Sequence, residues 1–205
     1  PEIPNSSACP YAQSFPYAIH SSIHFKKAKV EVLQPILHFG FGRDHLEKEL
    51  VDFGRSIHRM SKQVRKALEK AERFQALFYQ SLLNRGKEVL DQVESNEKVM
   101  VIVGRPYNSC DSGVNLEIPK KLRDLGVLAI PMDYLPLDSV APSEEIQEMY
   151  WRYGQKILAA GKIIKEDPRL YGVYITNFGC GPDSFISHFF RDLSKGKPYL
   201  QLEID

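Results

Sequence analysis

The chain has 205 residues, of which 43% are hydrophobic and 26% charged, and its net charge is +1. This composition is typical of a globular protein, and the balanced charge argues against a nucleic-acid partner, which would call for a basic excess. No segment approaches the roughly 20 apolar residues of a membrane span, so we expect no membrane partner. Three cysteines are too few for a disulfide scaffold and favour a reducing, cytoplasmic location.

Residues 1–42 predict irregular and strand structure that forms part of a truncated domain. Serine, proline and aromatic residues interleave between residues 4 and 17, which is typical of irregular backbone. Residues 28–39 have a strand-like composition, but Pro35 would confine that strand to a sheet edge or split it. Because the chain starts at Pro1 and stops within a strand-like run, we expect a piece of a longer polypeptide.

Residues 43–96 predict long amphipathic helices, and Asp44 with Glu47 resembles a capping box at their start. Two interpretations of this segment remain open. One interpretation is a coiled coil. The other is one helix or two, broken near Ser61 and packed on a sheet. We favour the second, because the alanines of the apolar stripe are small for the helix–helix interface of an independent coiled coil. Apolar residues recur at alternating spacings of four and three: Leu46, Leu50, Phe53, Ile57, Met60, Val64, Ala67, Ala71, Phe74 and Phe78.

Residues 97–205 alternate between strand-like and helix-like segments. The run 98–103 is continuously apolar, as in a strand buried on both faces. Such alternation with short connections predicts an α/β fold with a doubly wound (Rossmann- or flavodoxin-like) parallel sheet, preceded by the helical segment in the N-terminal half. We expect strands at 98–103, 127–131, 170–176 and 198–204, and helices at 115–125, 142–165 and 184–193.

Ligands of open α/β sheets bind beyond the carboxyl ends of the strands, which nominates the loops 104–112, 132–139 and 177–184. The first loop has neither the ending of a phosphate loop nor the Rossmann glycine pattern. It holds Cys110 and also Arg105, whose planar guanidinium is suited to binding an anion. Asp111 is equally well explained as the N-cap of the next helix.

The third of these loops carries a cysteine between two glycines. Glycines permit positive φ and close approach of the backbone to a cofactor, and a helix start favours a thiolate. The alternative is that Cys180 is a small buried side chain in a tight turn. The candidate cofactor-binding residues of this loop are Asn177, Gly179, Cys180, Gly181, Asp183 and Ser184.

The three cysteines could converge on one 4Fe–4S cluster. Because four thiolates normally hold such a cluster, three cysteines would leave one iron without a protein ligand. Cys9 precedes Pro10, a dipeptide that also occurs at iron–sulfur ligands but is weak evidence by itself. No metal-site spacing is apparent among the six histidines: His20, His24, His38, His45, His58 and His188.

Several segments resemble a domain of large CoA-substrate-specific enzyme activase proteins, which belong with the activators and components of 2-hydroxyacyl-CoA dehydratases. The resemblance lies in residues 104–138, 149–158 and 176–185, and residues 9–17 are also similar. In the full-length relatives an ATPase region of the actin/hexokinase type precedes this piece. Its phosphate motifs do not occur in this sequence, so we expect no ATP binding here.

The resemblance implies an iron–sulfur electron-transfer domain. In similar dehydratase subunits three cysteines ligate a 4Fe–4S cluster, which receives an electron driven by ATP hydrolysis in the activator. By this resemblance Cys9 and Cys180 are metal ligands, Cys110 is a third candidate, and the partner is the ATPase region of the same polypeptide or a dehydratase component. We expect no activity from this piece alone.

Two other functions remain open. The sheet edge could bind an acyl-CoA or a nucleotide without a cluster, using Arg105, the glycine-flanked turn and the helix N-termini. Alternatively, the helices of residues 43–96 could dock onto the ATPase region or onto a second copy of the chain, giving a homodimer.

Overall fold

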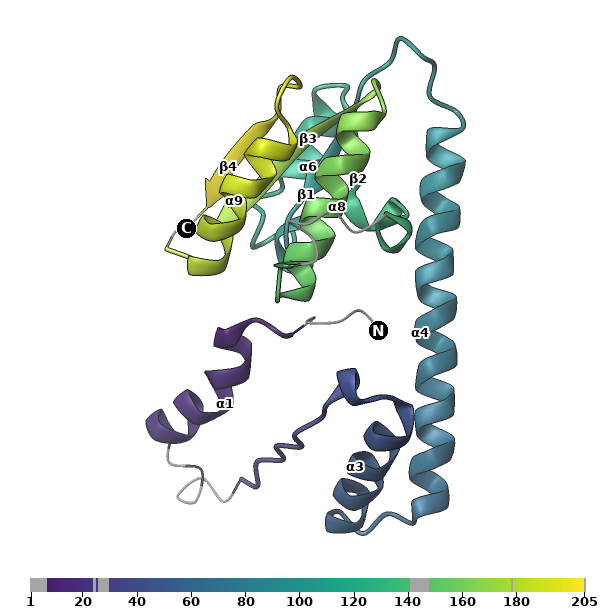
Figure 1. Ribbon diagram of the computed structural model, residues 1–205, viewed down its shortest axis with the longest axis vertical. Coiled ribbons are helices and arrows are strands. Elements are labelled where there is room, and N and C mark those ends of the chain that lie inside the picture. The colour runs from purple at the N-terminus through teal and green to yellow at the C-terminus, as the bar shows by residue number, and fades with distance from the viewer. Residues whose placement is uncertain (1–6, 24, 26–29, 141–147, 178, 205) are drawn as a thin grey trace. The chain divides into compact units, whose positions relative to one another are not determined.

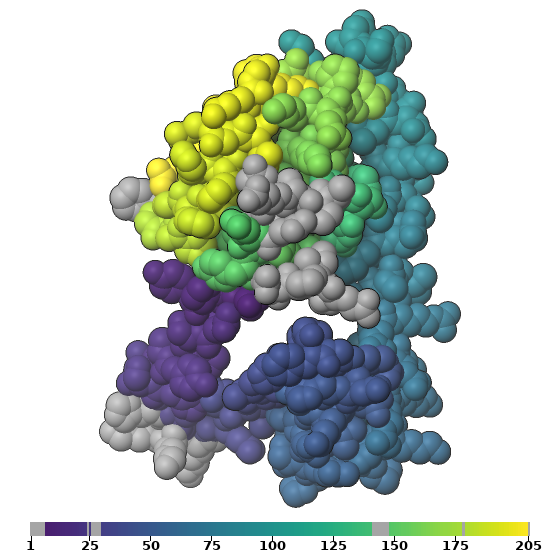
Figure 2. All heavy atoms as spheres, in the orientation of Figure 1, coloured from purple at the N-terminus to yellow at the C-terminus, as the bar shows by residue number. Residues whose placement is uncertain are grey.

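The structure is a computed structural model that describes residues 7–23, 25, 30–140, 148–177 and 179–204. The chain divides into two compact units, Pro1–Tyr79 and Gln80–Asp205, whose elements are labelled in Figure 1 and whose atoms are drawn in Figure 2. Among the described helices, none is long and apolar enough to cross a membrane.

The regular elements described in the N-terminal unit are helices, which corrects two sequence predictions. The prediction of irregular backbone up to residue 17 is wrong from Pro10 onward, because helix α1 spans Pro10–Ser22. Pro10 suits the first turn of a helix, where its missing N–H has no intrahelical partner to lose. The expected strand at 28–39 does not form over residues 30–39. The short helix η1 (Phe39–Phe41) begins at the end of this stretch. Residues 28 and 29 lie outside the described part.

Two helices, α3 (Arg43–Ser56) and α4 (Ser61–Leu90), follow, so the predicted break near Ser61 is confirmed. Gly54 lets them approach, because a Cβ there would overlap the Val64 side chain. The apolar stripe is only partly buried: Leu46 and Leu68 are inside, whereas Phe74 and Phe78 are 69% and 55% exposed.

A four-stranded, all-parallel sheet forms the centre of the C-terminal unit, which confirms the predicted α/β fold. Its strands are β1 (Val99–Val103), β2 (Leu128–Pro131), β3 (Leu170–Asn177) and β4 (Leu200–Ile204), in the order β2-β1-β3-β4. In the register, Val99 pairs with Leu128 and Leu170, and Val173 pairs with Leu200. The two central strands are almost wholly buried, as their continuous apolar runs require.

Helices cover both faces of this sheet (Figure 1). Ile118 and Leu122 of α6 (Ile118–Asp124) pack against a core that includes Val173. The neighbouring Gly172 faces the other side, where a Cβ would touch Phe190 of α9 (Gly181–Leu193) and Ile164 of α8 (Arg152–Glu166). The sheet is therefore doubly wound.

Some helix boundaries differ from the sequence prediction. The loop expected at 104–112 contains a one-turn helix, α5 (Pro106–Cys110), and two short helices, η2 (Met132–Tyr134) and η3 (Leu137–Ser139), follow β2. The expected helix 142–165 is not continuous: residues 142–147 lie outside the described part, and Met149 and Tyr150 are not helical. Helices α5 and α6 each carry a proline in the first turn, Pro106 and Pro119, where proline is tolerated.

Candidate functional site

The strand order places a topological switch point between β1 and β3. From β1 the chain crosses to β2 on one side of the sheet, and then to β3 on the other. In such sheets the crevice beyond the carboxyl ends of these two strands is the usual ligand site. The loops that begin at Gly104 and after Asn177 meet at this edge, so we build the candidate site there.

Gly104 allows the first loop to cross the end of β3. Its φ is +154°, and a Cβ at this position would lie 2.8 Å from the Ile175 carbonyl oxygen. Only glycine adopts this backbone without strain. The close approach then directs Arg105, the next residue, towards β3 and the start of α9.

Arg105 and Asp183 form a buried ion pair at this edge. The Nη2 atom of Arg105 donates to Oδ2 of Asp183 at 2.6 Å and to Oδ1 of Asn177 at 2.7 Å. The side chains of Arg105 and Asp183 are only 11% and 3% exposed. The same Asp183 oxygen accepts the backbone N–H of Asn177 at 3.0 Å. The pair therefore joins the ends of β1 and β3 to the first turn of α9.

The charges of this pair complement each other and the helix. Burial would by itself lower the pKa of Arg105, but the carboxylate of Asp183, followed by Tyr107 and Cys180, outweighs burial and raises the pKa. Asp183 lies in the first turn of α9, where a negative charge is favoured by the helix dipole. Arg105 therefore stays cationic, and an external anion would have to compete with Asp183 for it.

The sequence interpretation missed two buried polar residues at this edge, Asn108 and Tyr174. Nδ2 of Asn108 donates to Asn177 Oδ1 at 2.8 Å and to the Ile175 carbonyl at 3.2 Å. Burial raises the pKa of Tyr174 far above its ordinary value. Within the described residues, the Tyr174 hydroxyl, Asn108 Oδ1 and Arg105 Nε have no hydrogen-bond partner. Such atoms are the ones that bound water or a ligand would satisfy.

Cys180 is the N-cap residue of α9 and is partly exposed, with a free thiol. Its backbone N–H donates to the Asn177 carbonyl at 3.2 Å, and its own carbonyl accepts the Ser184 N–H at 2.9 Å. Gly179 before it has a φ of +66°, a left-handed conformation that favours glycine. The predicted residues of this loop thus lie in one turn, with the Cys180 thiol at the start of α9.

Cys110 lies at a different place in the same unit. It ends α5, is exposed, and lines an open pocket of about 400 Å³ whose wall includes Lys120 and Arg123 of α6. Asn115, also in the wall, is 2% exposed, and its Oδ1 has no partner among the described residues. The nearby Asp111 accepts the backbone N–H groups of residues 113 and 114 and so caps that turn. It is not the N-cap of the next helix, α6, because Glu117 occupies that position.

The three thiols are divided between the two units. Cys9 directly precedes α1 in the N-terminal unit, whereas Cys110 and Cys180 belong to the C-terminal unit. Two thiols are fewer than the four that normally hold a 4Fe–4S cluster. The C-terminal unit therefore supplies only part of such a ligand set.

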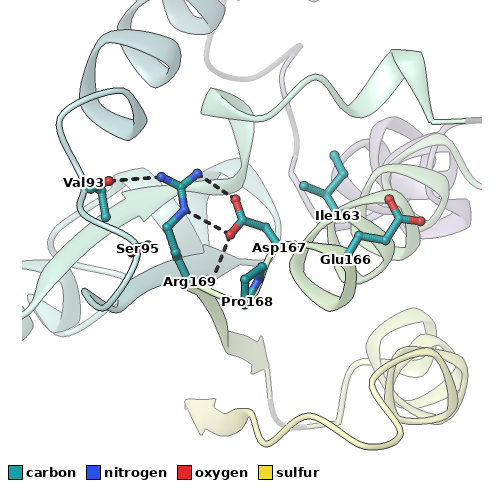
Figure 3. A pocket seen from close by; sticks show the side chains of 7 residues that line it. All are labelled: Val93, Ser95, Ile163, Glu166, Asp167, Pro168 and Arg169. Atoms are coloured by element: carbon teal, nitrogen blue, oxygen red, sulfur yellow. Dashed lines mark hydrogen bonds and ion pairs between the residues drawn. The ribbon is translucent and has the colours of Figure 1, made fainter.

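A second, larger pocket of about 660 Å³ lies at the opposite edge of the sheet, before β3 (Figure 3). Its arginine, Arg169, is engaged by the protein: it donates to the carbonyls of Leu90 and Val93 at 3.1 and 3.2 Å and pairs with Asp167 at 2.9 Å. Hydrogen bonding from Arg169 lowers the pKa of Asp167. We interpret this crevice as structural, because its arginine holds the end of α4 against the sheet.

A further group of polar side chains in the N-terminal unit was missed by the sequence interpretation. Ring nitrogens of His38 and His45 and a carboxylate oxygen of Glu49 all lie within 4.8 Å of one another. The spacing of histidines alone gave no sign of a metal site; the i, i+4 pair formed by His45 and Glu49 was the available signal.

Comparison with known proteins identifies one related family. A family described as the CoA enzyme activase uncharacterised domain matches residues 1–135, a range that includes Cys9, Arg105 and Cys110 and ends before Cys180. A search of curated proteins and a search of solved structures found no match. The match covers well over half of the chain and agrees with the resemblance of residues 9–17 and 104–138. The chain therefore belongs to the CoA enzyme activase uncharacterised domain family.

Proposed function

We propose that this chain serves a CoA enzyme activase system as an iron–sulfur electron-transfer domain, in which Cys180 donates one thiolate to the cluster. The carrying observation is the position of the Cys180 thiol, partly exposed at the first turn of α9 beside the β1/β3 switch point. When bound, such a cluster accepts one electron and passes it on. Membership of the activase family supports an activator-related role.

The residues around Cys180 would hold its thiol in a fixed place. The left-handed backbone of Gly179 and the two hydrogen bonds of the Cys180 backbone define the turn. Arg105 fixes Asp183 and Asn177 on either side of that turn.

The remaining ligands must come from elsewhere. By the family resemblance we propose Cys9 as the second ligand in preference to Cys110, which lines the α6 pocket. Two more thiolates would complete an ordinary 4Fe–4S set. We propose that a partner, either the ATPase region or a dehydratase component, supplies these thiolates. It could supply both, or it could supply one and leave one iron without a protein ligand.

Anaerobic reconstitution with iron and sulfide tests this proposal. We expect the parent chain, reconstituted together with its activase partner, to develop an absorption band at roughly 400 nm, as thiolate-bound iron gives. Cys180→Ala should lose the band, Cys9→Ala should weaken it, and Cys110→Ala serves as the matched control that keeps it. An equal band in Cys180→Ala, or no band in the parent chain with its activase partner present, would contradict the proposal.

The pocket beside Cys110 favours a second candidate function, the binding of an acyl-CoA or a nucleotide without a cluster. Its volume lies in the range of small-molecule sites, and Lys120 and Arg123 form exposed ion pairs with Glu117 and Asp124 for which phosphate groups could compete. Calorimetry with CoA would test it: we expect binding that Lys120→Ala/Arg123→Ala weakens at least tenfold. Lys162→Ala, a lysine on α8, is the control. Equal affinity in all variants would count against this function.

A further inference from the structure

The second half of the N-terminal unit contains a group of three side chains that can bind a metal ion. His38 precedes η1, while His45 and Glu49 lie four residues apart on α3 and therefore share one face of that helix. Nδ1 of His38 lies 2.6 Å, and Nε2 of His45 lies 3.0 Å, from the same Glu49 oxygen, Oε1. Two imidazoles thus converge on one carboxylate oxygen.

The surrounding structure holds this group in place. The backbone N–H of His38 donates to the other oxygen of Glu49, Oε2, at 2.8 Å, which orients the carboxylate and leaves Oε1 towards the two rings. The Phe41 ring stacks on His38 at 4.9 Å between centroids and meets His45 edge-on at 5.2 Å. Contacts of this kind, which fix a ligand's orientation, are typical around metal sites.

We propose that His38, His45 and Glu49 bind one divalent transition-metal ion, for which Zn²⁺ is the probe. Two histidines and one carboxylate are a known set of three protein ligands for zinc, with a fourth position left for water. Zinc–ligand bonds of about 2.0–2.1 Å in a tetrahedron separate the donor atoms by about 3.3 Å. Small side-chain rotations would open the present 2.6 and 3.0 Å contacts to that spacing.

Solvent access and the charge balance of the group agree with this proposal. Both histidine side chains are 45% exposed and Glu49 is 18% exposed, so an ion can enter from solvent. The ion pairs found for Glu49 within the described residues are with these two histidines, while the nearby arginines Arg43 and Arg65 pair with Glu47. No described arginine or lysine therefore neutralises the carboxylate in place of a metal.

The composition of the N-terminal unit gives a structural reason for a metal. Among its described residues, the buried hydrophobic side chains are Leu46, Val51 and Leu68. A core this small rarely stabilises a fold by itself, and small domains often gain stability from a structural metal. The ion would fasten the segment around η1 to α3. This inference concerns a different unit from the proposed cluster site and does not depend on it.

Equilibrium dialysis with Zn²⁺ tests the site in the complete 205-residue chain. We expect one tightly bound ion per chain, and at least tenfold weaker binding in His38→Ala, His45→Ala and Glu49→Gln. The matched control is His188→Ala, which removes another i, i+4 pair of histidine and carboxylate, with Asp192, that has no third ligand among the described residues. This control should bind Zn²⁺ as the parent does.

X-ray absorption at the zinc edge separates this site from the cysteines. We expect only nitrogen and oxygen ligands at about 2.0–2.1 Å, whereas thiolate ligands would lie at about 2.3 Å. Absence of zinc binding, sulfur in the first coordination shell, or unchanged binding in His45→Ala would each overturn the proposal. The first result would mean that the three side chains form only hydrogen-bonded pairs.

Discussion

The Nη2 atom of Arg105 lies 2.6 Å from Oδ2 of Asp183, although 78 residues separate the two in sequence. The pair is nearly buried and links the end of β1 with the first turn of α9, directly beside Cys180. Arg105 is therefore not a free anion-binding side chain. Its role in this fold is to hold the turn that presents the thiol.

The first prediction concerns this pair. Asp183→Asn should destabilise the C-terminal unit by about 3–5 kcal/mol, because it leaves the Arg105 charge buried without its partner. Arg105→Met should cost a similar amount, and the double variant should cost less than the sum of the two. Urea unfolding followed by the fluorescence of the buried Trp151, the single tryptophan, reports on this unit.

The exposed pair Arg85–Glu88, in the same unit as Trp151, is the control for that measurement. Both of its side chains are 60% exposed, so Glu88→Gln should change stability by less than about 1 kcal/mol. If Asp183→Asn costs no more than Glu88→Gln, the buried pair does not stabilise the site.

Gly104→Ala should destabilise the protein and disturb the switch point. The new Cβ would meet the Ile175 carbonyl oxygen at 2.8 Å in a backbone of φ +154°. Strained backbone of this kind costs about 1–3 kcal/mol per residue. Gly181→Ala is the matched control, because a Cβ there meets nothing within 4 Å and φ is ordinary. Thermal unfolding of both variants should show a lower Tm for Gly104→Ala alone; equal Tm values would refute the close approach.

A pH-dependent prediction follows from Asp133. Burial, only partly offset by Lys156, raises the pKa of Asp133 above its ordinary value of 3.8. The folded state therefore binds the proton more tightly than the unfolded state, and this contribution to stability is complete below about pH 3.9 and is lost as the pH rises through the folded pKa. Asp133→Asn should thus increase the free energy of unfolding at pH 7 and change it little at pH 3. A loss of stability at pH 7 would contradict this assignment.

Tyr174→Phe should leave stability unchanged or increase it. The hydroxyl of Tyr174 is buried and has no hydrogen-bond partner among the described residues, so its removal relieves an unsatisfied polar atom. The ring would keep its packing on Phe190, 4.9 Å away between centroids. Urea unfolding tests this, with Phe190→Ala as a control that should cost about 3–5 kcal/mol. A loss above about 1 kcal/mol in Tyr174→Phe would mean that the hydroxyl is bonded, most simply to water.

The sequence predicted the α/β half well because its two central strands, β1 and β3, are largely apolar runs and the strand-like and helix-like segments alternate with short connections. It did not predict α1, because a proline at residue 10 and another at residue 16 indicate irregular backbone unless the first is recognised as a helix start. The composition of residues 28–39 suited a strand, but composition carries no information about a partner strand. Strand order was likewise not readable, since it depends on contacts between distant segments.

Part of the candidate site was predictable for the same reason. The rule for carboxyl ends of parallel strands nominated the loops of Arg105 and Cys180, and both lie at the switch point. The pairing of Arg105 with Asp183 could not be read from the sequence, because it depends on the tertiary approach at Gly104. The histidine group was missed because His38 reaches His45 and Glu49 only through the turn at η1.

Iron and acid-labile sulfide bound per chain, measured after anaerobic purification together with the activase partner, test the central claim most directly. We expect the parent chain to retain both in comparable amounts and Cys180→Ser to lose them, while Cys110→Ser keeps them. Iron and sulfide contents that are unchanged in Cys180→Ser, or absent from the parent chain, would contradict the assignment of Cys180 as a cluster ligand.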